Sequence, residues 1–131
     1  MTAGLSAVNL ANAWLDTMRG TSASNFTADT TLFCQCHTGD PGASGTANVS
    51  TGIATRQAIN WNAASAGSQS LTSTVAFSAT GSDTITHVAV FGASSAGTFY
   101  YSAALSASKA VTNGDTLNLT ALTFALTPIA A

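Results

Sequence analysis

The chain has 131 residues, the length of one domain, and combines 46% hydrophobic residues with only 6% charged ones, where an ordinary soluble domain carries roughly 25% charged residues. Three basic and five acidic side chains give a net charge of -2. This balance excludes the basic cluster that binding to nucleic acid or to an anionic membrane requires. So few charges leave a weakly hydrated surface, which favours a protein that works inside a permanent assembly.

The first predicted element is an α-helix over residues 6–19. Ser6 suits the N-cap, Arg19 lies in the last turn where a cation suits the helix dipole, and Gly20 stands where helices commonly stop. Apolar residues recur at helical spacing at Val8, Ala11, Leu15 and Met18, with Leu10 and Trp14 widening the stripe. We expect this apolar face to pack on the rest of the domain, with docking on a partner as the alternative.

A series of β-strands follows the helix. Residues 21–30 are rich in Thr, Ser, Asn and Asp and predict a loop. Runs rich in β-forming residues then follow at 31–37, 53–61, 71–77, 84–91 and 99–105, with two more around Leu117 and Phe124. Turn signals at 38–42, 81–83, 94–97 and 113–115 separate them. The pattern predicts a mainly β single domain over residues 1–131: an antiparallel β-sandwich or barrel of about seven to eight strands, preceded by one helix.

The stretch Cys34-Gln35-Cys36-His37 is the one constellation that resembles a metal site. A structural zinc site needs four ligands, and strand alternation sends His37 to the face opposite the two thiols. A disulfide between Cys34 and Cys36 would span about 6.5 Å of extended strand, at the strained end of the allowed range. We therefore expect two free, buried cysteines that act as small hydrophobes, and no metal or cofactor.

No catalytic residues are predicted. The chain has five dispersed Asp residues and no Glu, and it has neither a nucleophile elbow nor a phosphate-binding glycine loop. His87 is expected on a strand, with one structural hydrogen bond. Arg56 is expected to pair with an Asp or with backbone carbonyls, and its alternative role is that of an interface anchor.

Aromatic residues offer a further candidate site. Tyr100 and Tyr101, in the run that Phe99 opens, would form a sugar-binding platform with Trp61 if all were exposed. We favour core or subunit-interface positions, because large aromatic side chains drive both kinds of packing. The candidate interface residues are Trp14, Arg56, Trp61, Tyr100 and Tyr101.

Six motifs in a fixed order link the chain to a known family. They are residues 9–16 (NLANAWLD), 31–33 (TLF), 37–42 (HTGDPG), 54–59 (ATRQAI), 85–91 (ITHVAVF) and 111–117 (VTNGDTL). The sequence resembles short phage proteins commonly labelled tail fibre or virion structural proteins, which occur beside head and tail genes in many siphophages. It departs from their pattern at Cys34 and Cys36, where aliphatic residues are usual, at Asn48 in place of an acidic residue, and at Ile53 in place of an aromatic one.

The resemblance implies a non-enzymatic virion component, made in the cytoplasm of the bacterial host. Because the chain lacks the repeats of a long shaft, we favour a capsid decoration subunit that binds the outside of the assembled head. The alternative is a tail fibre or tail-tip component that recognises the host surface. The expected partners are the major capsid protein or other virion proteins. A homotrimer is expected, joined through the 6–19 helix or a strand edge.

Overall fold

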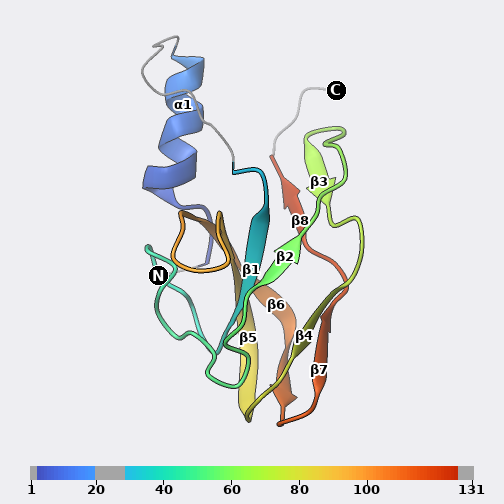
Figure 1. Ribbon diagram of the computed structural model, residues 1–131. Coiled ribbons are helices and arrows are strands. Elements are labelled where there is room, and N and C mark those ends of the chain that lie inside the picture. Colours follow the sequence, from blue (N-terminus) through green and yellow to red (C-terminus); the bar gives the residue numbers. More distant parts are fainter. Residues whose placement is uncertain (1–2, 20–28, 127–131) are drawn as a thin grey trace.

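The helix lies at the start of the described structure. In the computed structural model, residues 3–19 and 29–126 are described (Figure 1). The helix opens with a π-helical turn, η1 (Ala7–Ala11), and continues as α1 (Asn12–Met18). Ser6 is confirmed as its N-cap, because Oγ of Ser6 accepts a hydrogen bond from the backbone N–H of Asn9 at 3.2 Å. The predicted stop at Gly20 and the predicted loop up to residue 28 lie outside the described residues.

Eight strands follow the helix, which confirms the mainly β prediction. They are β1 (Leu32–His37), β2 (Gln57–Ile59), β3 (Ser68–Ser70), β4 (Val75–Ser78), β5 (Asp83–Phe91), β6 (Phe99–Val111), β7 (Thr116–Leu119) and β8 (Thr123–Ala125). The predicted strand 53–61 is wrong as a continuous strand, since only Gln57–Ile59 pairs in the main sheet as β2, and Trp61 forms an isolated bridge with Leu71. Strand β3 was not predicted, because its sequence is polar and carries no apolar alternation.

The strands form an open, two-layered arrangement. The main sheet has the order β2-β1-β5-β6, and two ribbons, β3-β8 and β4-β7, complete the fold. Every pairing is antiparallel. The described sheets do not close, so the sandwich alternative holds and the barrel does not. In Figure 1 the two ribbons lie together on one side of the long strands β1, β5 and β6.

The larger core fills the space between the main sheet and the ribbons. Cys34 and Cys36 of β1 lie opposite Val90 and Val88 of β5 in the sheet register, so all four side chains point to one face. They are buried in one apolar cluster with Phe77 from the ribbon side, which is fully buried. The predicted alternation of β1 is therefore confirmed, with both cysteines in the core.

The opposite face of the main sheet carries a smaller cluster of Ala89, Phe91 and Phe99. Parts of the irregular chain from residue 38 to 56 cover this face, since Gly45 approaches Phe99 and Arg56 lies over Phe91, whereas Ile53 of the same segment joins the larger core. Gly45 adopts a φ of 72°, and a Cβ added at this position would overlap the Phe99 ring. This glycine is required both for its left-handed backbone and for the close approach to the ring.

The helix packs through a different side from the predicted one. Leu10 is 4% exposed, and Trp14 meets the Phe124 ring edge-on at 5.6 Å between centroids. In contrast, Val8, Leu15 and Met18 are 79%, 69% and 88% exposed. The prediction that the whole apolar stripe packs on the domain is thus wrong for these three side chains, because the helix touches the sheet only along its Leu10 and Trp14 side. None of the helices in the described residues has the length and hydropathy needed to cross a membrane.

Candidate interaction surfaces

Arg56 lies one residue before β2 and fastens the turn between β5 and β6. Its Nη1 donates to the carbonyl oxygens of Ala93, at 2.9 Å, and Ala96, at 2.6 Å. Its Nε donates to Oε1 of Gln35 at 3.1 Å, and its guanidinium carbon lies 3.6 Å from the centre of the Phe91 ring. Pairing with backbone carbonyls is thereby confirmed, whereas the role of Arg56 as an interface anchor stays a prediction.

Both tyrosines of the predicted platform are buried. Tyr100 is 6% and Tyr101 is 8% exposed, and both belong to the main core cluster. The hydroxyl of Tyr100 donates to Oδ2 of Asp29 at 2.6 Å, and burial, helped by this bond, raises the pKa of Tyr100 to about 12. The preferred core position is confirmed for the tyrosines, so these rings offer no flat surface to a sugar.

A small apolar pocket lies between the helix and the sheet. It has a volume of about 170 Å³, and Trp14, Trp61, Tyr101 and Phe124 are among the residues that line it. Nε1 of Trp61 and the hydroxyl of Tyr101 have no hydrogen-bond partner among the described residues, yet both atoms are closed off from solvent. The accessible wall of the pocket is therefore almost wholly apolar.

The Cys34 to His37 segment is part of the core. Burial raises the pKa of Cys36 to about 12, and burial together with the neighbouring Cys36 raises the pKa of Cys34 as well. On the other face of the strand, Nδ1 of His37 bonds to the carbonyl oxygen of Ala47 at 2.8 Å. No group of three or more His, Cys, Asp or Glu side chains able to hold a metal occurs in the described residues. Thiols with such raised pKa values are poor nucleophiles and poor metal ligands.

One organising carboxylate was missed by the sequence reasoning, which placed Asp83 only within a turn. Oδ2 of Asp83 accepts hydrogen bonds from Oγ of Ser50 at 2.8 Å and from the backbone N–H groups of Thr51 and Gly52, each at 2.9 Å. These bonds, that from Gly52 first, lower the pKa of Asp83. The polar run from residue 50 to 52 resembles any surface turn, so no local signal linked it to a carboxylate some 30 positions later.

His87 is on β5, as predicted. Its Nδ1 lies 2.8 Å from Oγ1 of Thr86, within hydrogen-bonding distance. In the sheet register it stands opposite His37 of β1. The two imidazoles are therefore neighbours across the pair of strands, on the face that Arg56 also covers.

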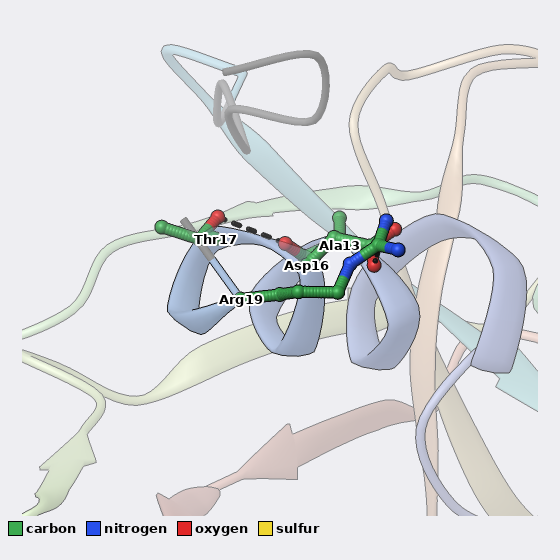
Figure 2. A network of polar contacts seen from close by, with 4 residues as sticks. All are labelled: Ala13, Asp16, Thr17 and Arg19. Atoms are coloured by element: carbon green, nitrogen blue, oxygen red, sulfur yellow. Dashed lines mark hydrogen bonds and ion pairs between the residues drawn. The ribbon is translucent and has the colours of Figure 1, made fainter. Parts of the chain in front are cut away.

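The exposed side of the helix is neutral in charge. Nη2 of Arg19 pairs with Oδ1 of Asp16 at 3.0 Å, and Oγ1 of Thr17 donates to the carbonyl oxygen of Ala13 at 2.9 Å (Figure 2). These contacts lie within the helix itself, and Val8, Leu15 and Met18 stay exposed beside them.

A second open surface is the outer edge of β6. The N-terminal chain covers the start of this edge, where the backbone N–H of Ser6 bonds to Tyr100 and that of Ser102 bonds to Gly4. Beyond Ser102 no described strand pairs with this side of β6, which is an edge of the main sheet. As far as the described residues extend, the exposed side of the helix and this edge are thus the two surfaces that fit the subunit contacts predicted from the sequence.

Comparison with known proteins identifies the family. The model of the family described as Podophage GP4 fiber I protein gp80 matches residues 5–127 of the chain. The chain belongs to this gp80 family. Its family name places it among the structural proteins of bacteriophage particles, as the resemblance implied, but the phage named is a podophage and not a siphophage. A comparison with curated proteins finds no match.

Proposed function

We propose that this gp80-family protein is a non-enzymatic capsid decoration subunit that binds the outside of the assembled phage head. The family match over nearly the whole chain carries the virion part of this proposal. The compact sandwich supports the decoration part. The described residues form a short domain with no repeated shaft, a shape suited to many identical sites on a shell.

The absence of catalysis is supported by the positions of the reactive side chains. Cys34, Cys36 and His37 are buried, and Asp83 and Asp115 hold turns together through backbone hydrogen bonds. Each of these side chains has a structural partner or a core position. A shell-binding role needs only surface complementarity, which requires none of them to react.

The expected partner is the major capsid protein, and the expected working form is a homotrimer at a symmetry axis of the shell. A decoration subunit that binds the assembled shell and not its free subunits stabilises the shell by mass action. Three copies around an axis present three identical contacts at once, which raises the overall affinity for a surface of the same symmetry.

A second candidate function is that of a fibre or tail-tip component that contacts the host. The word fiber in the family description favours it. A chain of this size reaches far from the particle only if other chains or further copies extend it. The burial of Tyr100 and Tyr101 removes the aromatic platform on which a sugar-binding version of this idea relied.

Copy number per particle separates the two functions. Quantitative mass spectrometry of purified virions would measure this chain against the major capsid protein. We expect hundreds of copies in a simple ratio to the capsid subunit, because a decoration subunit repeats with the symmetry of the shell. A count between about three and eighteen, as tail symmetry allows, would overturn decoration and leave the tail component.

A further inference from the structure

The strands β6 and β7 follow each other along the chain but do not pair. The turn over residues 112–115 joins them (Figure 1), yet β7 pairs with β4 and leaves β6 at the edge of the main sheet. Each of the two strands therefore has a side along which no strand of the described residues pairs. The backbone N–H and C=O groups along such an edge are a template for a further strand.

An apolar slot opens between these two strands. This β6–β7 slot has a volume of about 330 Å³, and the half-buried side chains that line it include Ala103, Leu105, Leu117 and Leu119. Phe77 of the core also lines it, so the slot reaches the space between the two layers. Since a cavity of about 150 Å³ holds one benzene ring, the slot has room for about two apolar side chains. An extended strand would place every second side chain in it.

The N-terminal segment shows what kind of chain this edge of β6 accepts. Leu5 forms an antiparallel bridge with Tyr101, and the backbone N–H of Ser102 donates to the carbonyl oxygen of Gly4 at 2.9 Å. An extended segment thus already covers the start of the edge. By strand alternation the N–H of Ala104 points to the same side as that of Ser102, where no described strand lies. The same antiparallel pairing can therefore continue beyond Ser102.

Two features of the open edge disfavour pairing with the same edge of a second copy. Ile85 lies opposite Lys109 and His87 lies opposite Ala104, so the stretch of β6 between these two positions stands against a single residue of β5. Such a bulge bends an edge strand, and a lysine on an edge opposes edge-to-edge pairing. A single extended segment follows a bent edge more easily than a whole sheet does.

Lys109 also indicates the charge of the occupant. It is exposed and lines the slot. Of the three basic residues of the chain, Arg19 pairs with Asp16, and Arg56 bonds to backbone carbonyl oxygens. Lys109 has no ion-pair partner among the described residues. In a chain with so few charges, an unpaired cation at the slot favours a segment that carries an acidic side chain.

We propose that the β6–β7 slot binds an extended segment of another virion protein, which adds a strand to β6 beyond Ser102. Its alternate apolar side chains enter the slot, and an acidic side chain lies beside Lys109. In this mode of recognition the main-chain hydrogen bonds supply affinity and the side-chain pockets supply specificity. The inference deepens the proposed function, on which it rests for the presence of a neighbouring virion protein, because it names the surface and the chemistry of the contact.

The first test compares amide hydrogen exchange of the chain in purified virions with exchange of the isolated chain. The virion holds the chain with its natural neighbours, so no partner needs to be identified beforehand. We expect exchange over residues 103–110 to slow by about tenfold or more in the virion, because outward N–H groups such as that of Ala104 gain acceptors. Equal exchange of this stretch in the two samples, or slowing confined to the N-terminal helix, would overturn the proposal.

The second test reverses the charge at the slot. A phage whose own copy of the gene is inactivated is supplied with the wild-type chain, with Lys109→Glu or with Lys109→Arg, and mass spectrometry measures the copies per virion. We expect Lys109→Glu to reduce the copies incorporated by about tenfold or more, since like charges then meet. Lys109→Arg keeps the charge and should be incorporated like the wild type.

The two variants control for each other. Because Lys109 is exposed, we expect urea unfolding to show an intact fold in both. Incorporation of Lys109→Glu at the wild-type level would contradict an acidic partner. An equal loss in both variants would contradict it as well, because charge would not explain that loss.

Both tests are made on the virion, wherever in the particle the chain lies. A chain with hundreds of copies whose residues 103–110 exchange equally in both samples refutes the slot alone. A chain with few copies whose residues 103–110 are protected refutes decoration alone.

Discussion

The two faces of the main sheet are held by different forces. On the ribbon side, Cys34, Cys36, Val88 and Val90 meet Phe77 in a buried apolar core. On the other side, the covering chain is fastened mainly by individual polar contacts, those of Arg56 above all and that of His37 with Ala47. The first face depends on buried area, which is non-directional, and the second depends on geometry.

This difference decides which substitutions each face tolerates. An apolar core accepts many side chains of similar volume, so its sequence is loosely constrained. The covering chain on the other face is held by directed hydrogen bonds and one close glycine contact, so it accepts few substitutions. We therefore expect the free energy of unfolding to fall most when volume is lost on the ribbon side. On the covered side, we expect it to fall even after small chemical changes.

Loss of volume on the ribbon side should have the largest effect. Phe77 is fully buried in β4, and Phe77→Ala is expected to reduce the free energy of unfolding by about 3–5 kcal/mol, the sum of lost burial and a residual cavity. Urea unfolding measures the change. Ser78→Ala, on the exposed neighbour in the same strand, is the control and should stay within about 0.5 kcal/mol of the wild type.

On the covered side, the addition of one methyl group should be nearly as harmful. In Gly45→Ala, the new Cβ would overlap the Phe99 ring, and it would stand on a backbone with a φ of 72°. Overpacking and left-handed strain together should lower the free energy of unfolding by about 2–4 kcal/mol. Gly114→Ala isolates the strain, since Gly114 also has a positive φ, 94°, but its Cβ would meet nothing within 4 Å. Equal losses in the two variants would contradict the close contact with Phe99.

Arg56 tests whether geometry or charge matters on this face. Arg56→Lys keeps the charge but loses the planar group that bonds to Ala93, Ala96 and Gln35 and stacks on Phe91. We expect the free energy of unfolding to fall by about 1.5–3 kcal/mol, as for other hydrogen bonds from charged groups. Arg19→Lys makes the same exchange at an exposed ion pair and should cost less than about 1 kcal/mol.

The fold could be predicted from the sequence where alternation is strong. β1 and β5 lie within one residue of their predicted bounds, because their apolar residues alternate between turns rich in Gly, Asp and Ser. The same reasoning failed for residues 53–61. Their apolar side chains contribute to the core from an irregular segment, since Ile53 is 1% exposed without belonging to a strand.

The interaction surfaces were less predictable. Helical spacing revealed every apolar residue of the helix, but it could not say which side the sheet covers, since that depends on where the chain enters β1 and β8. The partners of Arg56 and Asp83 were hidden for a related reason. Most of them are backbone groups, whose positions follow from tertiary structure and leave no mark in the side-chain sequence.

The smallest predicted effect is a pH dependence that belongs to the covered face alone. His37 is fully buried there, and its burial, helped by the nearby Arg56 guanidinium, lowers its pKa despite the bond to Ala47. Above a pH of about 6.5, the ordinary pKa of histidine, the imidazole is neutral in both the folded and the unfolded chain. Below it the unfolded chain takes up a proton that the folded chain resists, so the free energy of unfolding falls by up to about 1.4 kcal/mol per pH unit.

Urea unfolding between about pH 7.5 and 5.5, above the range of ordinary carboxylates, measures this slope. His37→Asn keeps a donor towards Ala47 and should reduce the slope, whereas Ser78→Ala, which removes no titratable group, should retain it. An unchanged slope in His37→Asn would assign the pH dependence to another group and leave the two faces alike in this respect.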